Sequence, residues 1–283
     1  MYRTSGRDFP MMAGRGCPFR CVFCQRVTGS VLRSRAAEDI VDEMLAGTAR
    51  WNCDGVQFFD ETFTAHQKRT RAMCERMIEQ GVPQRLRWNC TSRVDTVNRD
   101  LLALMKRAGC RVIMFGMESG NQQVLDRVCK GIKLEQCLAA VRDCRALGIR
   151  SDVSFVLGLP GDNRKTVGET FAFSRQADPD FVSYFTLVPF PGTDAARLAE
   201  LEQDNLRLLH RDWSRYRLQF SDACRLTDVT PRQMTAMRLR AYARFYLRPR
   251  KIRNLLSMLD LRGLPKVVAH VFGGLFRSRS SAS

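Results

Sequence analysis

The sequence predicts an α/β fold in which helices cover a parallel sheet of six strands. Six apolar, β-branched or aromatic runs alternate with six amphipathic stretches before residue 190. Strands that alternate with helices of roughly 10–15 residues indicate βαβ units and therefore a parallel sheet. A doubly wound sheet and a partial TIM-like barrel both satisfy this pattern. In both, the ligand binds at the carboxyl ends of the strands.

The elements follow one another in a regular order. The predicted strands are short apolar runs bounded by glycine, proline or polar residues. They cover residues 11–14, 56–59, 86–90, 112–117, 151–157 and 181–187. The predicted helices carry apolar residues at helical spacing. They cover about 37–49, 66–80, 99–108, 121–128, 133–147 and 165–176.

The pattern and the charge both change after about Glu200. Of 46 basic and 29 acidic residues, 17 basic and 4 acidic residues lie in 205–283, so this part carries +13 and the first 204 residues only +4. We expect a core domain over 1–204 and a basic helical extension over 205–283, without strands. Thr230 and Pro231 predict a capped helix start, and Pro249 predicts its end.

Cysteine usage and the lack of a signal segment predict a cytoplasmic protein. No apolar run reaches the roughly 18 residues needed to span a bilayer, and the N-terminus lacks the apolar region of a signal peptide. Eleven cysteines are an odd number, and a chain with a full core needs no disulfide staples. The cysteines are then core thiols, metal ligands or redox groups.

Three cysteines stand apart because they fall within eight residues, directly after the first predicted strand. They are Cys17, Cys21 and Cys24, and we expect their thiolates to converge on one point. Thiolates select soft metals and iron–sulfur clusters. A structural zinc site usually closes with a fourth ligand at regular spacing, and none lies nearby. Three ligands for a four-iron cluster would leave one iron open to a substrate or cofactor.

The pattern Cys-x-x-x-Cys-x-x-Cys after a first strand resembles the radical S-adenosylmethionine (radical SAM) superfamily, from about Asp8 to about Leu198. The resemblance implies a partial TIM-like (βα)6 barrel with a C-terminal helical extension, a [4Fe–4S] cluster on the three cysteines, and SAM chelated by the open iron. It also implies reductive cleavage of SAM, a small-molecule or lipid-like substrate, and an electron donor of the flavodoxin or ferredoxin type.

The same resemblance assigns SAM contacts at successive strand ends. Phe23 takes the place of an aromatic residue near the adenine. Asp60 and Glu61 are candidates for the methionyl ammonium, although two carboxylates at a strand end are also typical of a solvated helix start. Arg93 suits the methionyl carboxylate, or it forms a salt bridge with Asp95 or Glu118. The remaining predicted contacts are Glu118 at the ribose, Gly158 and Pro160 at the adenosine, and Leu187 beside the adenine. No catalytic residue is predicted.

Several segments are similar to the cobalamin-dependent branch of this superfamily, which includes methyltransferases and anaerobic cyclases. They include Gly-Met-Glu-Ser-Gly at 116–120 and Pro-Phe-Pro-Gly-Thr at 189–193. That branch normally has a cobalamin-binding domain before the barrel, and this chain has only 16 residues before its first cluster ligand. Cobalamin is therefore a possible cofactor, but its binding domain is absent from these residues. Three interpretations follow: the sequence is part of a longer protein, a separate chain supplies cobalamin, or this member works without it. Methyl transfer and oxidative cyclisation or rearrangement both remain open.

Two alternatives use the basic C-terminal region. One is a zinc-stabilised nucleic-acid-binding module, which the nearly neutral first 204 residues argue against. The other is peripheral membrane contact through the apolar segment 264–276, which is flanked by Arg262 and Arg277. That segment could equally pack against the barrel or against a further domain.

Overall fold

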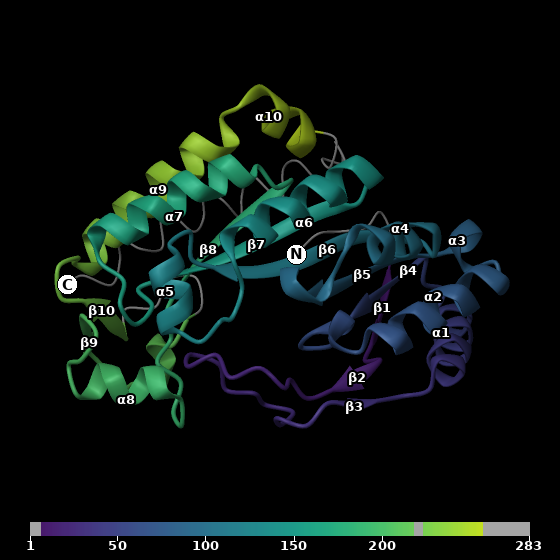
Figure 1. The fold of residues 1–283 in the computed structure, drawn as a ribbon, viewed down its shortest axis with the longest axis horizontal. Helices are drawn as coiled ribbons and strands as arrows, with labels where there is room; N and C mark the ends of the chain where they lie inside the picture. The colour runs from purple at the N-terminus through teal and green to yellow at the C-terminus, as the bar shows by residue number, and fades with distance from the viewer. Residues whose placement is uncertain (1–6, 218–222, 257–283) are drawn as a thin grey trace. The chain divides into compact units, whose positions relative to one another are not determined.

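The computed structural model describes residues 7–217 and 223–256 (Figure 1). The chain divides into two compact units, Met1–Arg238 and Leu239–Ser283. The first unit contains the sheet and every residue that the sequence places at a site. The apolar segment 264–276 lies outside the described residues.

The central sheet confirms the predicted α/β fold. Its six strands are all parallel, and their order in the sheet is their order along the chain. They are β1 (Asp8–Met11), β4 (Gly55–Phe58), β5 (Arg87–Ser92), β6 (Cys110–Glu118), β7 (Arg150–Leu157) and β8 (Phe181–Thr186). The first strand begins three residues earlier than predicted. Gly14 and Arg15 instead form β2 (Gly14–Arg15), which pairs antiparallel with β3 (Arg33–Ser34).

All six predicted helices are present between the strands. They are α1 (Ala37–Trp51), α2 (Gln67–Glu79), α4 (Arg99–Arg107), α5 (Gln122–Arg127), α6 (Leu134–Leu147) and α7 (Arg164–Ala177). A short α3 (Val82–Arg85) and three 3-10 turns, Phe63–Ala65, Val94–Thr96 and Trp213–Arg215, complete the connections. Asn98, Asn121 and Asn163 cap α4, α5 and α7 by accepting backbone N–H bonds.

The core lies between the helices and one face of the sheet. Trp88 packs against Phe58 and Phe63, with ring centroids 5.8 and 5.4 Å away. Its indole nitrogen donates to the carbonyl oxygen of Ala108 at 2.8 Å. Since successive side chains on a strand point to opposite faces, Asn89 and Thr91 lie on the other face of the sheet. That face is the concave interior of a partial barrel.

The chain after β8 differs from the expectation of helices alone. α8 (Asp194–Glu200) is followed by β9 (Leu206–Leu208) and β10 (Cys224–Leu226), which pair antiparallel. The expectation that no strand follows Glu200 is therefore wrong, because strands of three residues are too short to show a periodic pattern. The boundary between residues 204 and 205 stays a prediction.

Two further helices follow the β9–β10 pair. α9 (Pro231–Tyr246) starts as predicted, because the Thr230 hydroxyl accepts the N–H of Gln233 and the Gln233 side chain accepts the N–H of Thr230. α9 ends before Pro249, which begins α10 (Pro249–Leu256).

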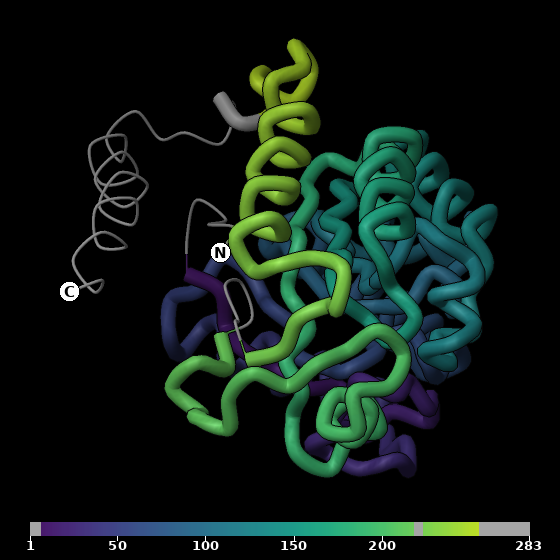
Figure 2. The backbone as a smooth tube through the Cα atoms, turned by 90° about the vertical axis from the view of Figure 1, so that its left-hand side faces the viewer, coloured from purple at the N-terminus to yellow at the C-terminus, as the bar shows by residue number. Residues whose placement is uncertain are grey.

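The loop that carries the three cysteines lies at the carboxyl ends of the strands. The Ala195 N–H of α8 donates to the Val22 carbonyl oxygen, and the Val22 N–H donates to the Val128 carbonyl oxygen after α5. Figures 1 and 2 show this loop in purple at the same end of the molecule as α8. The fold therefore collects the strand ends and the cysteines at one edge, as the sequence predicts.

Candidate functional site

The cysteine loop runs from β2 to β3 without regular secondary structure. Backbone hydrogen bonds join Cys17 to Gly29 and Cys24 to Cys21. Cys17 and Cys21 are half-buried and Cys24 is exposed. In the described part of the chain, no three His, Cys, Asp or Glu side chains are gathered closely enough to hold a metal ion. The expected convergence of the three thiols is thus not present in this conformation.

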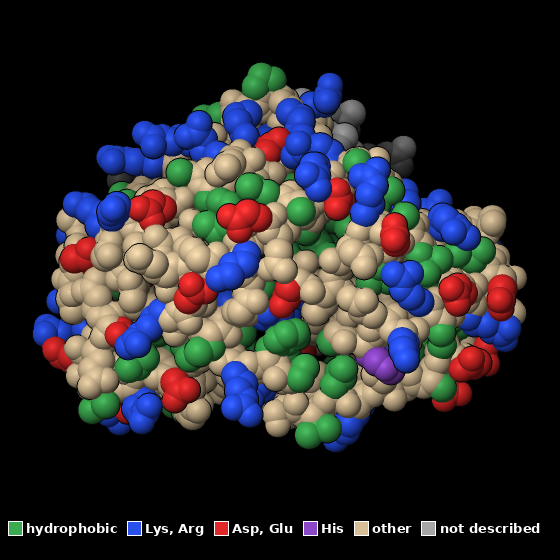
Figure 3. Space-filling view, viewed as in Figure 1, with side chains coloured by type: hydrophobic (Ala, Val, Ile, Leu, Met, Phe, Trp, Pro, Cys, Tyr) green, Lys and Arg blue, Asp and Glu red, His purple; other side chains and the backbone are tan. Residues whose placement is uncertain are grey.

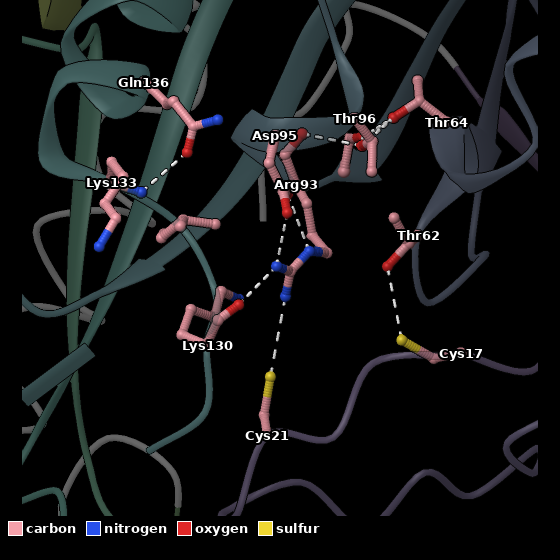
Figure 4. A network of polar contacts seen from close by, with 12 residues as sticks. Cys17, Cys21, Thr62, Thr64, Arg93, Asp95, Thr96, Lys130, Lys133 and Gln136 are labelled. Atoms are coloured by element: carbon pink, nitrogen blue, oxygen red, sulfur yellow. Dashed lines mark hydrogen bonds and ion pairs between the residues drawn. The ribbon is translucent and has the colours of Figure 1, made fainter. Parts of the chain in front are cut away.

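The surroundings of the thiols nevertheless suit an iron–sulfur cluster. The Cys17 sulfur lies 3.8 Å from the Thr62 hydroxyl, and the Cys21 sulfur lies 3.8 Å from Nη1 of Arg93 (Figure 4). Burial raises the pKa of the Cys21 thiol, while the positive charges of Lys130 and Arg93 lower it. The pKa of Cys21 is raised on balance, so these cations offset only part of the effect of burial. Cations beside a thiol stabilise the thiolate, which is the form that binds such clusters. The residues present therefore fit the group.

Arg93 is the centre of the polar network at the strand ends. Its guanidinium binds Asp95 through two bonds of 2.9 and 2.8 Å and donates to the Lys130 carbonyl oxygen at 2.5 Å. The guanidinium also lies 3.6 Å from the centroid of the Phe19 ring. The salt bridge to Asp95 is present, and Nη1 still faces Cys21. This geometry leaves one edge of the cation available beside the cysteine loop.

Glu118 pairs with a lysine that the sequence did not point to. Lys130 Nζ lies 2.8 Å from Glu118 Oε1, and both residues are more than nine-tenths buried. Glu118 has a φ of 67°, in the left-handed region, where the register between β6 and β7 shifts. A Cβ on Gly116 would come within 2.3 Å of the Glu118 carboxylate. The strand end is therefore shaped to hold this carboxylate against Lys130.

The adjacent carboxylates Asp60 and Glu61 both have protein partners. Asp60 is buried, accepts the Ala13 N–H at 2.8 Å, and lies 3.7 Å from Arg69. Burial raises the pKa of Asp60, against the effects of the Ala13 N–H and of Arg69. Glu61 accepts the Thr28 hydroxyl at 2.6 Å and so ties the far end of the cysteine loop to β4. Both carboxylates anchor backbone near the cysteines, and their assignment to an ammonium group stays a prediction.

The Gly158 turn is held in place by a buried aspartate. Asp162 accepts the N–H groups of Gly158 and Leu159 at 3.0 and 3.1 Å, and the Thr166 hydroxyl at 2.6 Å. Gly158 has a φ of 82°, which an L side chain rarely adopts. Desolvation outweighs these hydrogen bonds and raises the pKa of Asp162 to about 6. Three hydrogen bonds to Asp162 therefore hold the turn at Gly158, and its assignment to the adenosine stays a prediction.

The other predicted SAM contacts lie at the same edge or near it. Leu187 and Pro160 are buried, and the Leu187 N–H donates to the Leu157 carbonyl oxygen. Gly158 and Leu187 line a cavity of about 80 Å³ together with Thr186. Phe23 is half-buried in the cysteine loop. The structure brings Arg93 and Glu118 together through Lys130, but shows no direct contact of Asp60, Phe23 or Leu187 with that network.

Sequence reasoning missed Lys130 and Asp162. Lys130 lies in a loop 12 residues after Glu118 and meets it only in the folded chain. Asp162 directly follows the predicted glycine turn. Aspartate side chains at turns accept nearby backbone N–H groups, so its position in the sequence could have indicated this role.

The remaining cysteines behave mainly as core thiols. Cys74, Cys90, Cys110, Cys137, Cys144 and Cys224 are buried, whereas Cys53 is half-buried and Cys129 is exposed. Burial raises the pKa of Cys137 and Cys144 to about 12. These neutral thiols fit the interpretation that the helix carrying them faces the core.

Comparison with known proteins identifies the family to which the chain is similar. The family described as "Radical SAM superfamily" matches residues 11–174. An uncharacterized methyltransferase of Pyrococcus horikoshii is 32% identical over 252 residues, which are 88% of this chain and 54% of that protein. The anaerobic magnesium-protoporphyrin IX monomethyl ester cyclase of Cereibacter sphaeroides is 34% identical over 190 residues, which are 65% of this chain and 30% of that protein.

A solved structure shares the fold. The methyltransferase TsrM of Kitasatospora setae, solved with cobalamin and a [4Fe–4S] cluster bound, superimposes with a TM-score of 0.64 at 23% identity. The match covers 69% of this chain and 37% of that one. It supports the partial TIM-like barrel, and none of these matches supports the nucleic-acid alternative. The chain spans about half or less of the length of the relatives named here.

Proposed function

The chain belongs to the radical SAM superfamily, and we propose that it forms the catalytic barrel of an enzyme that cleaves SAM reductively and acts on an organic substrate. The observation that carries the proposal is the cysteine loop at the strand ends. Its thiols meet Thr62 after β4 and Arg93 after β5. Three cysteines within eight residues of sequence, with cations beside them, suit an iron–sulfur cluster with one open iron.

Within this proposal, Cys17, Cys21 and Cys24 hold three irons of a [4Fe–4S] cluster. When bound, such a cluster supplies the electron that breaks a carbon–sulfur bond of SAM. Arg93 and Lys130 hold positive charge beside the thiols, which stabilises anionic groups in a partly buried site. Glu118, held by Lys130, offers a carboxylate to the nucleoside. The Gly158 turn, held by Asp162, offers backbone groups to it. Phe23, Asp60, Glu61, Pro160 and Leu187 complete the proposed SAM contacts.

The proposed substrate surface is the concave face of the sheet. Asn89 is 5% exposed, and its Oδ1 has no hydrogen-bond partner in the described structure. An unpaired buried amide oxygen is costly unless another molecule satisfies it. Thr91 lies on the same face, two residues further toward the strand end. This face therefore suits an organic molecule with a hydrogen-bond donor.

The reaction class is proposed as methyl transfer or oxidative cyclisation, after the names of the methyltransferase and cyclase relatives. Cobalamin belongs to this proposal only as a cofactor held outside these 283 residues, by a further domain or a partner chain. A flavodoxin- or ferredoxin-type protein is the proposed electron donor. No helix in the described part of the chain is both long and apolar enough to span a membrane. Cytoplasmic location and membrane contact through 264–276 stay predictions.

Anaerobic reconstitution with iron and sulfide tests the proposal. We expect about four irons per chain, the visible absorbance of an iron–sulfur cluster, and formation of 5′-deoxyadenosine when SAM and dithionite are added. Cys17→Ala, Cys21→Ala and Cys24→Ala should each lower the iron content and abolish cleavage. Cys53→Ala is the matched control, because Cys53 is also half-buried but lies outside the loop. Iron content that survives Cys17→Ala unchanged would contradict the assignment.

A further inference from the structure

The excess positive charge of the first 204 residues is confined to the segment that holds the cysteines. Residues 9–37 contain five arginines and no aspartate or glutamate. The other residues of 1–204 carry a net charge of −1. The arginines lie at positions 15, 20, 26, 33 and 35, on both sides of Cys17, Cys21 and Cys24. A barrel that is neutral elsewhere thus surrounds its proposed metal ligands with cations.

Most of these arginines face solvent. Arg15, Arg20, Arg33 and Arg35 are exposed, and Arg26 is half-buried. Arg35 pairs with Glu43 at 2.5 Å, and Arg33 donates to the Thr28 carbonyl oxygen at 2.9 Å. Within the described structure, the side chains of Arg15 and Arg20 make no hydrogen bond or ion pair. Neither cation is therefore neutralised by a residue that the structure describes.

An open hollow lies beside the loop at the carboxyl end of β1. Arg15, Arg33 and Arg35 line it together with Met12 and Phe59, and Glu43 is its acidic member. Phe59 is 60% exposed, and Val27 and Val31 are also exposed on the loop. Figure 3 shows basic and hydrophobic side chains together along the lower border of the molecule, where Figure 1 places the loop. Basic groups around exposed apolar side chains are typical of a protein-binding surface.

We propose that this surface, residues 9–37 with Phe59, docks an acidic one-electron donor protein of the flavin or iron–sulfur class. The inference rests on the proposed function, because it supplies the electron that the cluster needs. One electron leaves the donor and one is accepted at the metal centre, and no proton or other group passes between the proteins. Electron transfer weakens steeply with distance, and Cys24 is exposed beside these arginines.

Charge complementarity identifies the partner. A basic surface steers an acidic protein toward productive encounter. Electron-transfer complexes bury small areas and exchange quickly, which suits a surface with the exposed side chains Val27, Val31 and Phe59. A nucleic acid or an anionic membrane would bind the same charges, but neither would deliver an electron to the thiols.

The test compares two reductants on one reconstituted protein. The variant Arg15→Glu/Arg20→Glu reverses the two unpaired charges, and Arg15→Gln/Arg20→Gln removes them. The matched control Arg107→Glu/Arg175→Glu reverses two exposed arginines in the last turns of α4 and α7. Those turns lie at the opposite end of the sheet, where the strands begin. The probe is a recombinant bacterial flavodoxin with its NADPH-dependent reductase, and dithionite is the reductant that needs no docking.

We expect Arg15→Glu/Arg20→Glu to lower flavodoxin-driven formation of 5′-deoxyadenosine about tenfold at low salt. Arg15→Gln/Arg20→Gln should lower it less. Dithionite-driven formation and iron content should stay unchanged, as should all activities of the control variant. Calorimetric titration provides a second readout: the Kd for flavodoxin should rise about tenfold in the charge-reversal variant, and binding to the unaltered protein should weaken with added salt.

Several results would overturn the docking surface. Equal losses with flavodoxin and with dithionite would assign the arginines to the metal site itself. Flavodoxin binding that is unaffected by charge reversal would exclude the surface. The surface would also be excluded if Arg15 and Arg20 were needed for binding to phosphatidylglycerol vesicles but not for binding to flavodoxin. If dithionite also yields no 5′-deoxyadenosine and no iron is incorporated, the proposed function fails and the docking proposal fails with it.

Discussion

Lys130 connects three parts of the strand-end network. Its ammonium pairs with Glu118, its carbonyl oxygen accepts from Arg93, and its charge offsets part of the effect of burial, which raises the pKa of Cys21. A buried ion pair gives little net stability, but removal of one partner leaves an uncompensated buried charge. One side chain therefore determines whether the carboxylate of Glu118 is stable in its place.

We expect Lys130→Met to lower the free energy of unfolding by about 3–5 kcal/mol. The double variant Lys130→Met/Glu118→Gln should recover most of that loss, because no unpaired charge remains. Anaerobic urea denaturation of the four proteins of this cycle measures the coupling. A double variant as unstable as Lys130→Met would show that the pair is not the source of the loss.

Asp162 predicts a pH dependence of stability. Its pKa is about 6 in the folded protein against an ordinary value of 3.8 in the unfolded chain, so the folded state binds more protons between these values. Asp162 contributes about 3 kcal/mol to the free energy of unfolding below about pH 4. This contribution is lost as the pH rises to about 6. Asp162→Asn, which keeps the shape and the acceptor oxygen, should remove this decline. Urea denaturation of both proteins from pH 4 to pH 7 checks it, and parallel profiles would refute it.

At the scale of elements, the contact of the β6 end with α7 leaves no room for a side chain. A Cβ on Gly120 would lie 2.5 Å from the Phe173 Cβ and 2.7 Å from the Thr170 Cα. The Gly120 N–H also donates to the Thr170 hydroxyl at 2.9 Å. Glycine at this position lets the strand that carries Glu118 approach the helix that follows the Gly158 turn.

Gly120→Ala should therefore destabilise the protein by about 1–3 kcal/mol, because the helix backbone must move. Gly168 is the matched control within α7, since a Cβ there meets nothing within 4 Å. Gly168→Ala should stabilise the protein by about 0.4–1 kcal/mol, because alanine loses less conformational entropy in a helix. Denaturation midpoints of the two variants provide the comparison. A stable Gly120→Ala protein would mean that the two elements separate at low cost.

The elements that the sequence predicted share a strong local pattern. The six strands of the sheet and their helices have apolar runs or stripes long enough to stand out. β2–β3 and β9–β10 were missed, because two or three residues per strand form no period. Lys130 was missed for another reason: its partner Glu118 belongs to another element, and only the folded chain brings them together. The cysteine spacing was visible from sequence, whereas the positions of the three sulfurs depend on a loop without regular structure.

At the scale of the whole molecule, ligand binding should stabilise the loaded protein. A ligand present at 100 times its Kd adds about 2.7 kcal/mol to the free energy of unfolding. SAM should therefore raise the melting temperature of the reconstituted chain by several degrees. The variant Cys17→Ala/Cys21→Ala/Cys24→Ala should show little or no shift. Anaerobic thermal scans with and without SAM measure both, and equal shifts in the two proteins would contradict binding at the cluster.

The net charge of the whole chain hides differences between its parts. A net charge of +17 suggests a general polyanion binder, yet the barrel is neutral except around its cysteines. The basic character of 205–283 is a separate feature. Its role in contact with a further domain, a membrane or an acidic partner stays a prediction.

The strand order of the sheet has a consequence for the newly made chain. Each strand pairs with the strand synthesised before it, so the sheet can grow from β1 onward as the ribosome proceeds. The three cysteines leave the ribosome before most of the sheet, whereas Lys130 follows roughly a hundred residues later, or about 5–20 s at ordinary rates of translation. During that interval the thiols lack the buried cation of Lys130. Delivery of iron and sulfide is therefore best timed after β6 and its following loop have emerged.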